Sequence, residues 1–269
     1  MVDAKRVHVR LYFLTIFLLL SGPLFADKAA VYSLFKETEV LLDEKDYGRA
    51  EENCRKILSI DRESYIAYNF LGRIYMDKGE EEKAIDYFSK SIDIYPYQPS
   101  LFLAIASLKN KLGNAKEVFL SFEQGLKYNP EDFSLNYNLG LLYLLEKQDP
   151  HKALALLNKA ESLRPISDKL AYLLGITNLL TGKNFLSLEY VSILRDLNKE
   201  YLAMQLENFI RKYSEGSSID ISNVMQVYSN QPDNLPSQKE AVKQNLSIDN
   251  PVTKVSGSGT LQIKQQFKK

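Results

Sequence analysis

Apolar residues recur at helical spacing in pairs of short blocks along most of this chain. The clearest pair lies in residues 65–98. Within each block the apolar positions are three or four residues apart, as one face of a helix requires, and they are Tyr68, Leu71, Tyr75, Ala84 and Phe88. Gly79 stands between the blocks and Pro96 follows the second, so a turn separates two helices. Neither helix can bury its apolar face alone, and the hairpin therefore needs neighbours of the same kind.

The same pattern returns at a fixed period. The small residue of the second block recurs at steps of 34, 34, 35 and 34 residues, at Ala50, Ala84, Val118, Ala153 and Ser187. A large-small pair in the first block recurs as Leu71-Gly72, Ile105-Ala106, Leu139-Gly140 and Leu174-Gly175. A repeat of about 20–50 residues is typical of solenoids, in which stacked units bury one continuous core.

The order of these residues, with Pro96, Pro130 and Pro165 closing three units, resembles the tetratricopeptide repeat (TPR) family, whose unit is a helix-turn-helix of about 34 residues. The resemblance implies an all-α, right-handed α-solenoid of about five repeats, which would lie at 31–64, 65–98, 99–132, 133–167 and 168–201. A further amphipathic helix over 198–213 is expected to cap the open end of the stack. Together these segments form a predicted TPR domain over residues 27–213.

The first 26 residues predict a secretory signal peptide. Lys5, Arg6 and Arg10 precede an apolar run over 11–20, and Ala26 ends the segment with a small residue. The run is shorter than the roughly 20 residues that a membrane span needs. We therefore expect an exported, periplasmic protein, cleaved after Ala26. The alternative is a chain that stays anchored in the membrane by an uncleaved N-terminal segment.

Residues 214–269 are predicted to form a disordered polar tail. Ser, Asn, Gln, Lys and Gly dominate its composition, so too little apolar surface is available to offset the entropy lost on ordering. One apolar patch, over residues 219–228, could dock locally on the folded repeats.

Charge and reactive residues exclude several classes of function. The chain carries 34 basic and 34 acidic residues, and removal of residues 1–26 leaves 31 and 33, a balance that does not favour nucleic acid or an anionic membrane as partner. After cleavage one histidine remains, His151, which we expect on the surface. The single cysteine, Cys54, is expected to be a small buried core residue. We expect no enzymatic activity, no cofactor and no metal, because neither a catalytic triad nor zinc-type spacing is present.

The resemblance also implies where a partner binds. In the TPR family, four positions of each first helix point into a concave face that holds a peptide. Carried onto this chain, the candidate peptide-binding residues are Asn69, Arg73, Tyr137, Asn138, Leu141, Leu144, Lys169, Tyr172, Ile176 and Leu179. Some family members clamp a C-terminal carboxylate, but only Asn138 and Lys169 match two of the five clamp positions here, so a clamp of that kind is not expected.

The second half of this face is apolar, and an apolar patch of a few hundred Å² on a surface usually marks a binding site. We therefore predict a non-enzymatic scaffold or adaptor that holds an apolar or amphipathic peptide segment of another envelope protein. A homodimer formed through the same patch, or a regulatory module of a membrane-bound envelope enzyme, are alternatives. A further alternative is that the face is filled from within, by tight closure of the stack, by the 198–213 helix or by the 219–228 patch.

Overall fold

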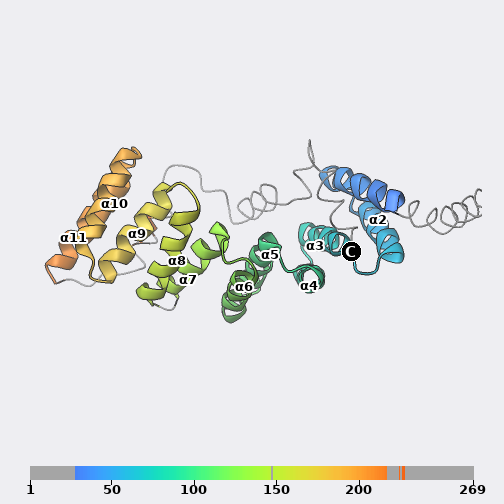
Figure 1. Ribbon diagram of the computed structural model, residues 1–269, viewed down its shortest axis with the longest axis horizontal. Helices are drawn as coiled ribbons and strands as arrows, with labels where there is room; N and C mark the ends of the chain where they lie inside the picture. The colour runs from blue at the N-terminus through green and yellow to red at the C-terminus, as the bar shows by residue number, and fades with distance from the viewer. Residues whose placement is uncertain (1–27, 147, 217–223, 225, 228–269) are drawn as a thin grey trace, which may run out of the picture. The chain divides into compact units, whose positions relative to one another are not determined.

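A computed structural model describes residues 28–146, 148–216, 224, 226 and 227 (Figure 1). Within these residues the chain is built of helices and short turns, with no strand, so the predicted all-α class of paired helices is confirmed. The predicted signal peptide over residues 1–26 lies outside the described residues, as does most of the predicted tail. The chain falls into two compact units, which divide between Tyr95 and Pro96.

The first unit contains a helix over residues 28–43 and three labelled helices, α2 (Tyr47–Ile60), α3 (Tyr65–Lys78) and α4 (Glu81–Ile94). The Asp46 carboxylate caps α2 by accepting a hydrogen bond from the backbone N–H of Arg49 at 3.2 Å. Gly79 ends α3 with φ at +75°, a left-handed conformation that glycine adopts without steric cost. The turn that the sequence predicts between the two apolar blocks is therefore the turn between α3 and α4.

The repeated large-small pair has a direct structural meaning in this unit. Leu71 and Phe88 are buried, and a β-carbon placed on Gly72 would collide with the Phe88 ring. The absence of a side chain at position 72 thus allows α3 and α4 to approach each other closely. Cys54 on α2 is fully buried, as the sequence predicts, and burial raises the pKa of its thiol to about 12.

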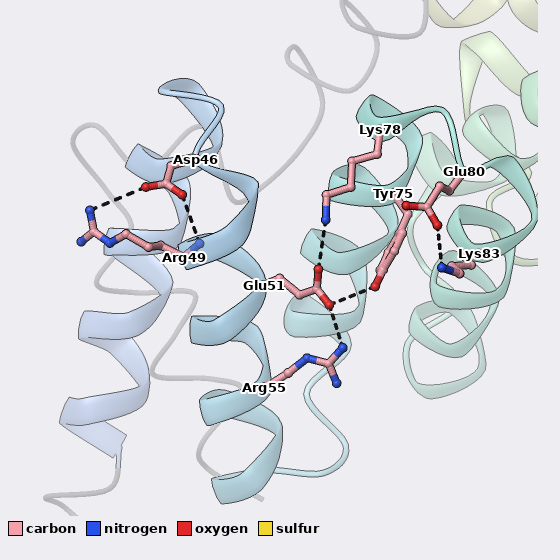
Figure 2. A network of polar contacts seen from close by, with 8 residues as sticks. All are labelled: Asp46, Arg49, Glu51, Arg55, Tyr75, Lys78, Glu80 and Lys83. Carbon is pink, nitrogen blue, oxygen red and sulfur yellow. Dashed lines mark hydrogen bonds and ion pairs between the residues drawn. The ribbon is translucent and has the colours of Figure 1, made fainter.

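A polar network joins α2 to α3 (Figure 2). The Glu51 carboxylate accepts hydrogen bonds from Arg55 at 2.7 Å, Lys78 at 3.1 Å and the Tyr75 hydroxyl at 2.9 Å. Burial of Glu51 opposes its ionisation, but these three donors outweigh the cost and hold its pKa at about 2. Since Arg55 lies on the same helix as Glu51 and the other two donors lie on α3, the network fixes the two helices against each other.

The second unit contains seven labelled helices, which are α5 (Pro99–Lys111), α6 (Ala115–Tyr128), α7 (Phe133–Leu145), α8 (Pro150–Leu163), α9 (Asp168–Leu180), α10 (Asn184–Asp196) and α11 (Glu200–Ser214). Asp149 caps α8 by accepting from the backbone N–H of Lys152 at 3.1 Å, and Pro150 is the first helical residue. An aspartate cap followed by proline at the first helical position is a typical helix start. No described helix is both long enough and apolar enough to span a membrane.

The core of the second unit is centred on α9, which lies between α8 on one side and α10 and α11 on the other (Figure 1). A β-carbon on Gly175 would collide with the side chain of Leu206, so α11 packs directly against α9. Leu202 and Leu206 are buried in this contact. The predicted capping helix is thus present and covers the last repeat.

Candidate functional site

Two candidate residues, Asn69 and Arg73, lie one helical turn apart on α3 in the first unit. Asn69 is buried and Arg73 is half-buried. Burial lowers the pKa of Arg73, while the carboxylates of Asp77, Asp43 and Glu39 act in the opposite direction. The guanidinium stays charged in any case. Arg73 is therefore a cation in an acidic setting on α3.

Three candidates lie on α7 in the second unit, namely Tyr137, Asn138 and Leu141, and all three are half-buried. The Asn138 side chain donates a hydrogen bond to the backbone carbonyl of Ser134 at 2.7 Å. The Tyr137 ring stacks on the Phe133 ring, with centroids 5.7 Å apart. Tyr137 and Leu141 pack against the core of the unit but keep part of their surface open to solvent.

Lys169 is half-buried near the start of α9. Burial lowers the pKa of its ammonium group, the Asp168 carboxylate raises it, and the nearby Lys199 lowers it further. Lys199 in turn forms an ion pair with Asp168 at 3.5 Å. These three residues form a charged edge beside the apolar part of the candidate face.

The remaining four candidates, Leu144, Tyr172, Ile176 and Leu179, have no solvent-exposed surface at all. In α9 every residue from 170 to 179 is buried, which an amphipathic helix with one open side would not show. Leu144, Tyr172 and Ile176 belong to one continuous apolar cluster that also draws on α8, α10 and α11. The sequence predicts these four residues on the concave face, and in the structure they are buried.

The apolar cluster that contains Tyr172 and Ile176 also includes residues beyond α11. Val224 is fully buried in the same cluster as Tyr172 and Ile176, and Val227 is partly buried against it. Gln226, between them, is exposed. We call Val224, Gln226 and Val227 the tail segment. The apolar patch over residues 219–228 was the signal in the sequence that pointed to such a contact, and the three described residues of the tail segment lie within it.

One polar group in this cluster lacks a hydrogen-bond partner among the described residues. The Tyr172 hydroxyl is buried and makes no hydrogen bond to any residue that the structure describes. Burial, and to a lesser degree the neighbouring Tyr201, raises the pKa of this hydroxyl above its ordinary value. An unpaired buried hydroxyl is unfavourable, because it gives up its hydrogen bonds to water. Tyr172 thus offers an unused donor and acceptor at the apolar part of the face.

The two reactive residues singled out in the sequence are Cys54, in the first unit, and His151, in the second. Cys54 is enclosed between helices of the first unit, where the raised pKa keeps the thiol protonated. His151 is exposed near the start of α8, as the sequence predicts. Of the ten candidate residues, five are half-buried and five are buried.

Comparison with known proteins agrees with the helical-repeat fold. Residues 65–98 and residues 121–167 each match a family model described as tetratricopeptide repeat. Over 72 residues the chain is 33% identical to the photosystem I assembly protein Ycf3 of Rippkaea orientalis, covering 25% of this chain and 41% of that protein. Over 89 residues it is 26% identical to the BBSome complex member BBS4 of Bos taurus, covering 33% of this chain and 17% of that protein. The chain thus spans less than half the length of either relative.

A solved structure shares the fold over a longer range. The tetratricopeptide repeat protein of Parabacteroides merdae superposes with a TM-score of 0.54 at 16% identity, covering 88% of this chain and 97% of that chain. At this identity the likeness concerns the fold alone. The paired helices form a helical-repeat scaffold for protein–protein contacts. The two matched segments and the shared fold support a protein of the tetratricopeptide repeat family.

Proposed function

We propose that this protein is a non-catalytic adaptor of the cell envelope. It holds an apolar or amphipathic segment of a partner protein against the inner face of α7 and α9, the side of these helices that carries Tyr137, Leu141, Tyr172 and Ile176. The observation that carries the proposal is the composition of that face. Tyr137 and Leu141 on α7 keep part of their apolar surface open to solvent beside the buried cluster that includes Tyr172 and Ile176. Such a surface gains free energy when a second apolar chain covers it.

The placement in the envelope is supported by the sequence of residues 1–26, which has the charged start, apolar run and small final residue of an export signal. An exported scaffold meets other exported or membrane proteins, so its partner belongs to the envelope. The mass of the mature protein tests this part. A chain that begins at Asp27 supports export and cleavage, and a full-length chain confined to the cytoplasm would contradict it.

The size of the face suits moderate affinity. If a partner covered about 400 Å² of apolar surface, the gross gain would be about 10 kcal/mol at roughly 25 cal/mol per Å². Much of this gain is offset by the loss of translational and side-chain freedom on association. With a loss of at least about 4 kcal/mol, about 6 kcal/mol or less remains, which corresponds to a Kd of tens of micromolar or weaker. Reversible contact of this strength fits an adaptor that exchanges partners.

Substitution at Leu141 tests the binding face with the purified mature protein. Leu141→Glu places a charge at a half-buried position of the proposed site, whereas Leu120→Glu places the same charge on α6, where Leu120 is 51% exposed. We expect the first variant, but not the second, to lose binding to the apolar segment of the envelope partner. Equal binding by the two variants, with wild-type helicity in both, would refute the proposed site.

A further inference from the structure

The inner face of α9 is covered more completely than the equivalent face of α7. Every residue of α9 from 170 to 179 is buried, while Tyr137, Asn138 and Leu141 on α7 keep part of their surface open. Both helices are first helices of a repeat, so the repeat pattern alone does not account for the difference. Beyond the repeats, Val224 lies in the apolar cluster that contains Tyr172 and Ile176 of α9, and Val227 packs against this cluster.

We propose that the tail segment binds intramolecularly to the inner face of α9, at the same site to which a partner segment binds. This inference rests on the proposed function for the identity of the site, but its occupant is a part of this chain. The geometry of the tail segment suits the role. Residues 224, 226 and 227 are helical, the two valines are three residues apart, and Gln226 is exposed between them. Residues three apart share one face of a helix, so the valines turn to the cluster together.

The contact is suited to displacement. Among the described residues beyond Gly216, Val224 lies within the cluster and Val227 packs against it. The Tyr172 hydroxyl, in the same cluster, is left without a hydrogen bond to any described residue. A partner that supplies equivalent apolar side chains together with one hydrogen-bonding group for Tyr172 would occupy the face more favourably than the tail segment does. The preferred partner is therefore an amphipathic helix with a polar group among its apolar anchors.

An internal occupant lowers the apparent affinity of any competitor by the fraction of molecules in which the site is free. The test uses the mature full-length chain and a fluorescent peptide with the sequence of residues 219–230. We expect the V224D/V227D chain to bind this peptide on the order of tenfold more tightly than the wild-type chain does, since the variant has lost its own competitor. The Q226D chain, which gains a charge at the exposed position between the valines, should bind like the wild type.

Three outcomes would overturn the inference. The first is equal affinity of the wild-type and V224D/V227D chains for the peptide. The second is loss of helical circular dichroism in V224D/V227D, which would make the tail segment a part of the core. The third is a wild-type dimer in light scattering that V224D/V227D converts to a monomer, which would place the tail segment of a second copy on the face.

The peptide experiment needs no envelope partner, so its result is separate from that of the proposed function. If the tail peptide binds the V224D/V227D chain and no envelope segment does, intramolecular binding by the tail segment is supported and the adaptor role is refuted. If an envelope segment binds the wild-type and V224D/V227D chains equally well, the adaptor role is supported and competition by the tail segment is refuted.

Discussion

Gly72 on α3 lies directly against the ring of Phe88 on α4, and a β-carbon at position 72 would collide with that ring. The contact shows why the repeat requires a small residue after its leucine. The same relationship returns in the second unit, where Gly175 on α9 lies against Leu206 on α11. The close approach of helices thus depends on single positions that carry no side chain.

Gly72→Ala should therefore destabilise the first unit by about 1–3 kcal/mol, the usual cost of overpacking a filled core. Gly48→Ala on α2 is the matched control, because the added β-carbon would meet only Asp46 Oδ1 at 3.8 Å, an ordinary contact. Alanine at position 48 should be neutral or stabilising by up to about 1 kcal/mol through helix propensity. Urea unfolding followed by circular dichroism measures both changes, and equal stability of the two variants would contradict the packing described here.

The hydrogen bonds to Glu51 predict a pH dependence of stability. Burial alone would raise the pKa of this carboxyl, but the three donors lower it from its ordinary value of 4.5 to about 2. Because the folded-state pKa is the lower one, the stabilisation is fully present above pH 4.5 and is lost as the pH falls from 4.5 to about 2. After allowance for screening by solvent, the loss should be about 1 kcal/mol.

Glu51→Gln should remove this part of the pH dependence and lower the free energy of unfolding at neutral pH. Glu44→Gln, in the exposed turn before α2, is the control and should leave the profile unchanged. The measurement is the free energy of unfolding in urea at several pH values. A Glu51→Gln profile that still falls between pH 4.5 and 2 as steeply as the wild type would show that the network of Figure 2 is not its source.

Tyr172, which is buried, and Tyr190, which is half-buried, should respond in opposite ways to loss of their hydroxyl groups. Tyr172→Phe removes a hydroxyl that has no partner among the described residues, so stability should stay equal or rise by up to about 1 kcal/mol. Tyr190→Phe removes a hydroxyl that donates to the Glu161 carboxylate, 3.1 and 3.2 Å from its two oxygens. That variant should lose about 1–2 kcal/mol. Thermal unfolding of the two variants gives the comparison, and a larger loss for Tyr172→Phe would mean that its hydroxyl is satisfied.

Much of the fold follows from the sequence, because its determinants are local. The period of Ala50, Ala84 and Ala153 fixes the hairpins, and the pair Asp149-Pro150 fixes the start of α8. The network at Glu51 was not predicted. Its Arg55 partner lies four residues away, a spacing that could have suggested an ion pair, but Tyr75 and Lys78 lie 24 and 27 residues away and meet it only through helix packing.

The candidate site was predictable only in part, for a related reason. Helical periodicity identifies the side of α9 on which Tyr172 and Ile176 lie, but it does not state what covers that side. Both residues are buried in a cluster to which Leu202 and Leu206 of α11 and Val224, all distant in sequence, also belong. The assignment of the ten candidate residues to peptide binding stays a prediction.

The central claim, that the inner face beside α9 receives an apolar segment of another protein, is tested most directly by site-specific photocrosslinking in living cells. A photoreactive amino acid replaces Tyr137, which is half-buried at this face, and in a second strain it replaces Leu120, which is exposed on α6. We predict that position 137, but not position 120, crosslinks to one apolar or amphipathic segment of an envelope protein, identified by mass spectrometry of the joined peptides. Crosslinks from position 137 that are absent, or that are no different from those of position 120, would contradict the claim.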